Sequence, residues 1–135
     1  MNTKRALAMT VLIVGIGVTL HVARAQQPPP GITRTDLQRH DLSIRGREVI
    51  QARVELAPGV SSVRHWHPGE EIVYLIEGEL VYEVEGKLPV TLKAGDVLFI
   101  PARTIHVARN VGSVPGAELA TYVIEKGKPP FVAVK

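Results

Sequence analysis

The sequence contains no cysteine, and aromatic residues make up only 4% of its 135 residues. Without cysteine the chain has neither disulfides nor thiolate ligands, so any metal site must use nitrogen and oxygen donors. The sequence also lacks a G-x-S-x-G nucleophile motif, a glycine-rich phosphate loop and a basic recognition helix. These absences argue against a serine hydrolase, a nucleotide-binding protein and a DNA-binding protein. The length has room for one domain.

Acidic residues are missing from the first 25 residues, which carry three basic residues, Lys4, Arg5 and Arg24. The formal net charge of +3 therefore comes from this segment alone, because the rest of the chain carries thirteen basic and thirteen acidic residues. A neutral domain lacks the positive surface that binding to a phosphate backbone requires. We therefore predict no nucleic-acid partner.

The same 25 residues have the organisation of a secretory signal peptide. A basic start is followed by an apolar stretch over residues 6–20 and by Ala-Arg-Ala at residues 23–25, which matches an A-x-A cleavage site. The apolar stretch is shorter than the roughly 20 residues that span a bilayer. We therefore predict cleavage near Ala25, export to the periplasm or the extracellular space, and no stable membrane anchor after cleavage.

The remainder of the chain is rich in short alternating segments separated by proline and glycine. Residues 34–41 allow one helical turn, but from residue 47 onward apolar and polar residues alternate with period two. The predicted strands cover residues 47–56, 60–67, 71–76, 79–85, 88–92, 97–100, 105–111 and 118–124. The predicted parts are a signal peptide (1–25), a proline-rich linker and N-terminal segment (26–46), a β domain (47–126) and a C-terminal tail (127–135). Eight short strands predict an all-β jelly-roll sandwich or barrel.

Four aromatic positions carry further expectations. Phe99 and Ile100 are predicted to fill the core, whereas Tyr74 and Tyr82 are predicted to point outward. Trp66 lies between two histidines and is predicted to face away from them, in a packing or dimer contact.

Three histidines have a spacing that suits metal binding. His65 and His67 are two residues apart on a predicted strand, so both imidazoles face the same side. A tight turn then lets Glu71 fold back toward them, and His106 arrives from a later strand. Three imidazoles and one carboxylate suit a divalent first-row ion and leave coordination positions open. The alternative is that these are structural histidines with satisfied hydrogen bonds.

Two longer motifs contain these residues. Residues 59–78 read G-x5-H-x-H-x3-E-x6-G, and residues 95–110 read G-x5-P-x-R-x2-H-x3-N. In this order, with 16 residues between them, they resemble the two motifs of the cupins. The resemblance implies a cupin double-stranded β-helix barrel holding one divalent transition metal, with Fe, Mn, Ni, Cu, Co and Zn all open. The ligands that it implies are His65, His67, Glu71 and His106.

Arg103 departs from the resemblance, because cupins usually have glycine at this position. One interpretation is a solvent-facing turn residue that tolerates a positive φ. The other is a substrate-binding residue whose guanidinium lies at the barrel mouth and attracts a carboxylate or phenolate. The two interpretations differ in the charge of the ligand that the protein would bind.

The resemblance does not imply one reaction, because cupins include enzymes, binding proteins and storage proteins. We predict a metal-dependent enzyme of dioxygenase or isomerase type that acts on a small organic substrate. The alternative is a non-catalytic module that binds a small ligand or a metal, and no catalytic acid or base is evident from the sequence. Exposed sheet edges and the apolar residues 131–134 of the tail predict a homodimer.

Overall fold

The computed structural model describes residues 28–134, which contain ten β-strands and no helix. No helix capable of crossing a membrane is therefore found among these residues. The predicted signal peptide and its cleavage site lie outside the described residues. The strands are β1 (Ile32–Asp41), β2 (Arg47–Leu56), β3 (His65–Trp66), β4 (Glu70–Glu77), β5 (Glu79–Val84), β6 (Val90–Lys93), β7 (Val97–Ile100), β8 (His106–Asn110), β9 (Gly116–Glu125) and β10 (Val132–Ala133).

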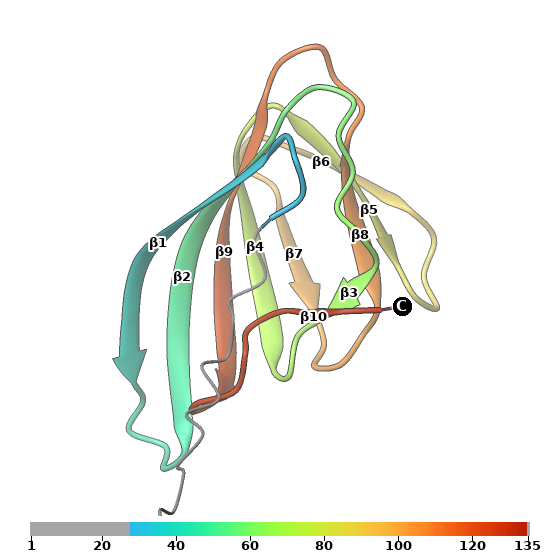
Figure 1. Ribbon diagram of the computed structural model, residues 1–135. Helices are drawn as coiled ribbons and strands as arrows, with labels where there is room; N and C mark the ends of the chain where they lie inside the picture. The colour runs from blue at the N-terminus through green and yellow to red at the C-terminus, as the bar shows by residue number, and fades with distance from the viewer. Residues whose placement is uncertain (1–27, 135) are drawn as a thin grey trace, which may run out of the picture.

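The strands form two five-stranded antiparallel sheets. One has the order β1-β2-β9-β4-β7 and the other the order β10-β3-β8-β5-β6. Figure 1 shows the long strands β1, β2 and β9 on the left and the second sheet on the right, with β10 crossing in front of the molecule. The all-β class and the two-layer arrangement of short strands predicted from the alternating pattern are confirmed.

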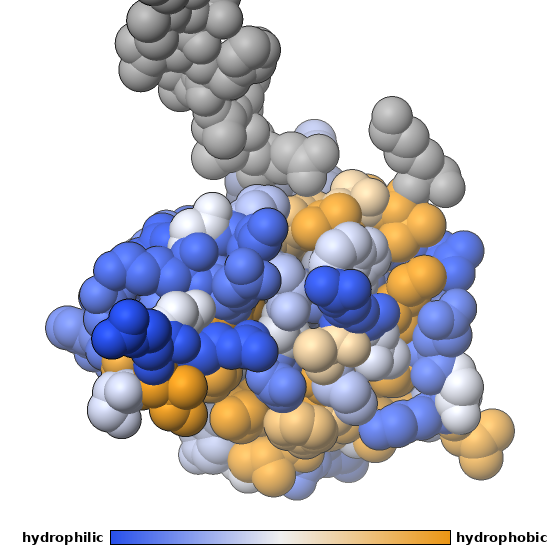
Figure 2. Space-filling model, turned by 90° about the horizontal axis from the view of Figure 1, so that it is seen from below, coloured by the Kyte–Doolittle hydropathy of each residue, from blue (hydrophilic) through white to orange (hydrophobic). Residues whose placement is uncertain are grey.

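The core lies between the two sheets because one face of each strand is apolar. In β4, Val73 and Leu75 are buried, whereas the alternating residues Ile72, Tyr74 and Ile76 are exposed on the outer face. The larger core cluster consists of the buried residues Leu56, Val73, Leu75, Leu80, Tyr82, Val84, Leu92, Ile100 and Ala108. Seen from below in Figure 2, hydrophilic residues gather mainly on the side of β1 and β2, and apolar residues stay exposed elsewhere on this face.

The N-terminal segment differs from its prediction. Residues 34–41 form no helical turn but belong to β1, which pairs with β2 from Ile32 opposite Leu56 to Asp41 opposite Glu48. The edge of β2 offers hydrogen-bond partners along a whole strand, which satisfies more backbone groups than one helical turn does. The sheet therefore begins fifteen residues before residue 47, the predicted start of the β domain.

Two predictions about single aromatic residues were wrong. Tyr82 is only 1% exposed, because it pairs with Ala108 on the inner face of the second sheet. Phe99 is 53% exposed, because it pairs with Ile72 on the outer face of the first sheet, while Ile100 enters the core. Adjacent apolar residues such as Phe99 and Ile100 do not show which of them faces inward, and strand register decides it.

The predicted strand over residues 60–67 is mostly loop. Only β3 pairs as a strand, although Ser61 makes an isolated bridge with Arg109. The single residue pair between β3 and β8 places His65 directly opposite His106.

Candidate metal centre

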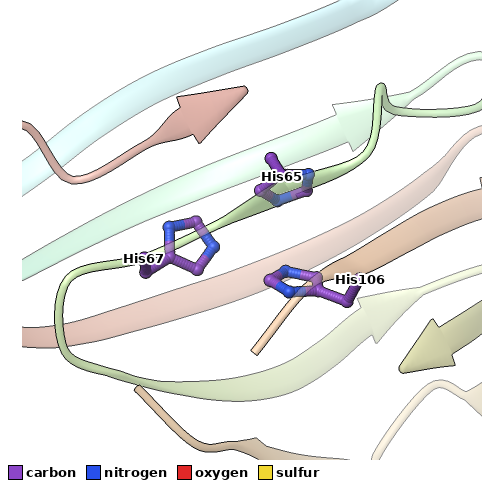
Figure 3. A group of neighbouring side chains, drawn as sticks. All are labelled: His65, His67 and His106. Atoms are coloured by element: carbon purple, nitrogen blue, oxygen red, sulfur yellow. The ribbon is translucent and has the colours of Figure 1, made fainter. Parts of the chain in front are cut away.

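Three histidines and one glutamate converge on the inner faces of the two sheets. His65 is the first residue of β3, and His67 is the residue after the end of that strand. Glu71 lies at the start of β4, and His106 is the first residue of β8. All four are 2–6% exposed. Figure 3 shows the three imidazole rings grouped together, with His106 facing the other two across the site. The structure thus brings together all four residues that the sequence predicted as metal ligands.

The turn between His67 and Glu71 depends on a glycine. A Cβ atom added to Gly69 would lie 1.9 Å from the carbonyl oxygen of Val123 on β9. Only glycine lets the backbone approach β9 this closely. The turn therefore returns the chain into β4 with the Glu71 side chain directed at the histidines.

Backbone carbonyls orient all three imidazoles. The Nδ1 atom of His65 donates to the carbonyl of Val63 at 2.8 Å, and that of His106 donates to the carbonyl of Thr104 at 3.0 Å. The Nδ1 atom of His67 donates to the carbonyl of Pro130. Because a carbonyl only accepts, Nδ1 carries a proton in each ring, and the lone pair of a neutral imidazole is then on Nε2. Metal-binding histidines in proteins have the same arrangement.

The free nitrogen atoms lie close enough to share one ion. One potential ligand atom from each of the three histidines lies within 4.8 Å of the others. The Oε2 atom of Glu71 is 3.1 Å from Nε2 of both His67 and His106. Within the described part of the chain, Oε2 of Glu71 and Nε2 of His67 are buried without a hydrogen-bond partner. Buried polar atoms without a hydrogen-bond partner are consistent with a metal site, and three imidazoles and a carboxylate would bind a divalent first-row metal.

The electrostatics of His65 and Glu71 favour the forms that bind metal. Burial, together with the neighbouring His106, lowers the pKa of His65 to about 4, so its imidazole is neutral at physiological pH. Burial opposes ionisation of Glu71, but the imidazoles of His106 and His67 outweigh it and lower its pKa. The centre therefore offers the neutral imidazole of His65 and the carboxylate anion of Glu71.

Comparison with known proteins identifies the family. The cupin domain family matches residues 52–123, which contain both motifs and all four residues of the centre. This chain belongs to the cupin family. The predicted resemblance is confirmed.

Curated cupin relatives include two bacterial proteins. The oxalate-binding protein of Thermotoga maritima is 40% identical over 74 residues, which cover 54% of this chain and 60% of the relative. Tetracenomycin polyketide synthase protein TcmJ of Streptomyces glaucescens is 43% identical over 63 residues, which cover 46% of this chain and 42% of the relative. The chain thus spans less than two thirds of the length of either relative.

Solved structures confirm the cupin double-stranded β-helix fold. Oxalate oxidase in complex with glycolate is 27% identical, with a TM-score of 0.63 over 78% of this chain and 56% of the other. Oxalate decarboxylase of Bacillus subtilis, which has Mn(II) centres, is 26% identical, with a TM-score of 0.58 over 64% of this chain and 24% of the other. A Klebsiella pneumoniae protein with a double-stranded β-helix domain is 22% identical and covers 82% of this chain and 91% of its own, with a TM-score of 0.62.

The C-terminal segment of this cupin covers the centre. The Phe131 ring stacks on His65 with ring centroids 4.5 Å apart and an interplanar angle of 24°. β10 pairs with β3, and the amide of Val134 donates to the carbonyl of Arg64 at 2.9 Å. The tail, which was predicted to reach a second chain, therefore packs on its own chain and shields His65 from solvent.

Arg103 has the positive φ that the sequence comparison suggested. Its φ is 59°, and it is the one non-glycine residue with a positive φ in the part of the chain that the structure describes. Its amide donates to the carbonyl of His67 at 2.8 Å. The exposed side chain lines a hollow of about 260 Å³ together with Trp66 and Lys128. Trp66 alternates with His65 and His67 along the chain, so Arg103 lies beside a side chain that faces away from the centre.

Asn110, the last residue of the second cupin motif, has a structural role. It is fully buried, and its side-chain amide donates to the carbonyls of Leu56 and Val114. Its side-chain oxygen accepts a hydrogen bond from the amide of Gly112. Asn110 thus holds the turn after β8 in place.

Sequence reasoning missed three polar residues inside the barrel, Arg34, Glu118 and Tyr122. Glu118 and Tyr122 share the inner face of β9 with Ala120 and Ile124. Glu118 occupies a position of the alternating strand at which an apolar residue is expected, and the sequence alone indicates this departure. Burial, and then the charge of Glu71, raises the pKa of both Glu118 and Tyr122 well above its usual value.

Proposed function

We propose that this cupin is an enzyme that binds one divalent transition metal and acts on a small organic acid, as a dioxygenase or an isomerase. The observation that carries the proposal is the convergence of three buried imidazoles with the carboxylate of Glu71. His65, His67, His106 and Glu71 would hold the ion. When bound, such a metal supplies Lewis acidity and, in the case of iron, chemistry with dioxygen.

The protein's own groups prepare the site for such a ligand. Three backbone carbonyls fix the planes of the imidazoles, so no ring has to reorient when the site is used. Phe131 and the surrounding core exclude bulk water, which strengthens electrostatic interactions inside the barrel. Burial, and then the charge of Glu71, raises the pKa of the Glu118 carboxyl and so favours its neutral form.

The relatives support a carboxylic acid as substrate. An oxalate-binding protein, an oxalate oxidase that binds glycolate and an oxalate decarboxylase with Mn(II) centres all resemble this chain. Small carboxylic acids offer two neighbouring oxygen atoms to a metal that keeps open coordination positions. Manganese is accordingly the first metal to test, followed by iron and zinc.

The second candidate function is a non-catalytic module that binds a small ligand or a metal. The burial of the centre favours the non-catalytic module, since the four side chains are almost fully buried and the C-terminal segment lies over them. The name of the Thermotoga maritima relative, an oxalate-binding protein, supports the same interpretation.

One experiment separates these candidates. The protein is loaded with Mn(II), Fe(II) or Zn(II), titrated calorimetrically with oxalate and glycolate, and assayed for oxygen uptake and products with both acids, catechols, flavonols and 1,3-diketones. His40→Ala on the exposed part of β1 serves as the control for histidine loss. Turnover that His106→Ala abolishes and His40→Ala retains supports the enzyme, and tight binding without turnover supports the module. Failure to bind any metal contradicts the enzyme, and failure to bind either a metal or an acid contradicts the module as well.

We also propose export, on the basis of the organisation of the first 25 residues. Cells that produce the complete chain should contain a shortened protein outside the cytoplasm that starts near Gln26, whereas deletion of residues 1–25 should keep it inside. N-terminal sequencing of fractionated cells makes the comparison. An uncleaved chain in the cytoplasm contradicts the proposal.

A further inference from the structure

A second polar group lies inside the barrel beside the metal centre. Arg34 of β1 pairs with Val54 of β2, and Val54 pairs with Glu118 of β9, so the three residues form one row across the first sheet. Paired residues in neighbouring strands point to the same face. Because Glu118 is buried, the inner face is the one that Arg34 shares. Tyr122 lies on the same face of β9, four residues further along.

Arg34 and Tyr122 link this row to the metal centre. The Arg34 Nη1 atom donates to the Tyr122 hydroxyl at 3.3 Å, and its guanidinium carbon lies 5.1 Å from the centre of the ring. The Tyr122 ring in turn lies 4.7 Å from the His67 ring, measured between centroids. The guanidinium thus contacts Tyr122, which in turn contacts the metal ligand His67. The Arg34 side chain is one quarter exposed.

Glu118 adds an unsatisfied group to the same cluster. It is 5% exposed, and within residues 28–134 its Oε2 atom is buried without a hydrogen-bond partner. A buried carboxyl without a partner costs stability, and its neutral form has one O–H donor to offer. The charge of Arg34 is also only partly used, since its ion pair is with Asp36, which is exposed, through Nε at 2.9 Å. The cluster therefore presents unused donors toward the interior.

We propose that Arg34, Tyr122 and Glu118 form a subsite for a second carboxylate on the ligand that the metal centre holds. The inference rests on the proposed function and names its substrate class as dicarboxylic acids. The Tyr122 ring lies between the guanidinium and His67 in this chain of contacts, so we expect the two carboxylates to be separated by at least one carbon. Acids such as malonate, succinate or glutarate should therefore fit better than oxalate.

The test is calorimetric titration of the Mn(II)-loaded protein with pairs of acids of equal chain length. The pairs are malonate and propionate, succinate and butyrate, and glutarate and pentanoate. At least one dicarboxylate should bind about tenfold or more tightly than its partner, the effect of one charge-assisted hydrogen bond. Equal affinities within every pair would overturn the subsite.

Arg34→Gln should remove most of this difference. It should weaken binding of the preferred dicarboxylate about tenfold or more and leave the monocarboxylate and Mn(II) within about twofold. The matched control is Arg45→Gln, which removes the same charge from an exposed position in the loop between β1 and β2. Equal weakening of both acids by Arg34→Gln, or equal effects of the two variants, would overturn the proposal.

A second pair of variants tests Glu118 without relying on Arg34. Glu118→Gln keeps a donor of similar shape and should hold dicarboxylate affinity within about threefold, whereas Glu118→Leu should lower it about tenfold. Equal affinities of these two variants would contradict the role of Glu118. Titration with Mn(II) alone comes first, because a protein that binds no metal contradicts the proposed function and removes the subsite with it. Metal binding without preference for two carboxylates contradicts the subsite alone.

Discussion

The imidazoles of the centre show what a motif predicts and what it cannot. The spacing of His65 and His67 placed both rings on one face, the tight turn after them pointed to Glu71, and the resemblance supported these residues together with His106. Two of the orienting carbonyls lie two residues before the ring that they hold. The third belongs to Pro130, which lies 63 residues from His67 in the sequence. No local pattern identifies a contact of that range, because it depends on how the C-terminal segment packs.

Arg103→Gly tests the residue that departs from the cupin pattern. A positive φ destabilises the folded state by about 1–2 kcal/mol when the residue is not glycine. Glycine removes this strain, but its greater conformational freedom in the unfolded chain cancels part of the gain in stability. We expect a gain in the free energy of unfolding of about 1 kcal/mol or less and unchanged carboxylate affinity, measured by denaturation and calorimetry. Arg103→Ala is the control, since it removes the charge but keeps the strain. A tenfold loss of carboxylate affinity in both variants would instead assign Arg103 to substrate binding.

The buried carboxylate of Glu48 should make the free energy of unfolding depend on pH. This carboxylate is 2% exposed and accepts hydrogen bonds from Arg39 at 2.7 and 2.6 Å and from the amide of Gly127 at 3.1 Å. The Arg39 hydrogen bond outweighs burial and lowers the pKa of Glu48. The folded state thus binds this proton less readily than the unfolded state. The resulting stability is complete above the unfolded pKa and is lost as the pH falls through the folded pKa.

Glu48→Gln should therefore lower the free energy of unfolding by about 1–3 kcal/mol at neutral pH and by much less near pH 3. Urea denaturation at both pH values makes the measurement, and Glu85→Gln, at an exposed position after β5, is the control. A loss that stays constant down to pH 3 would show that Glu48 acts through packing rather than through its charge.

Among the elements, long alternating strands were predictable and short ones were not. β2 and β9 have ten residues each, and their alternation shows which face is buried. β3 and β10 have two residues each, too few for any period to be visible. β1 escaped prediction for another reason, because its polar residues follow no simple alternation and a register shift interrupts it between Asp36 and Gln38. Its pairing depends on the open edge of β2.

The C-terminal segment should contribute to metal affinity. Deletion of residues 129–135 removes the carbonyl that holds the ring of His67 and the Phe131 ring that covers His65. Loss of such an orienting contact typically weakens metal binding about 10–100-fold, and we expect this range for the deletion. Phe131→Ala keeps the carbonyl and should have a smaller effect, while Lys128→Ala is the control. Titration with Mn(II) decides, and full affinity in the shortened chain would contradict the role of the segment.

For the whole molecule, the outer face of β4 and β7 indicates how two copies would pair. Ile72, Tyr74 and Ile76 of β4 are exposed there beside Val97 and Phe99 of β7. Monomers rarely leave so many adjacent apolar side chains in water. We propose a homodimer in which this face packs on its own copy about a two-fold axis, as an isologous interface does. The proposed dimer thus rests on this apolar face and not on the C-terminal tail, because the tail pairs with β3 of its own chain.

Light scattering tests the dimer. The wild-type protein should have the mass of two chains at micromolar concentration, and Tyr74→Glu combined with Phe99→Glu should reduce it to one, because burial of two charges in an apolar interface is costly. Leu88→Glu changes a residue that is exposed in the loop between β5 and β6 and should leave the dimer intact. A monomeric wild-type protein would contradict the proposed interface.

The central claim is that the three histidines hold a metal ion, and metal content tests it most directly. After dialysis and elemental analysis, the wild-type protein and His40→Ala should contain about one divalent transition metal per chain, whereas His65→Ala, His67→Ala and His106→Ala should contain little, because each loses one of a small set of ligands. Equal metal content in His40→Ala and His106→Ala, or no metal in the wild-type protein after incubation with Mn(II), Fe(II) or Zn(II), would contradict the account.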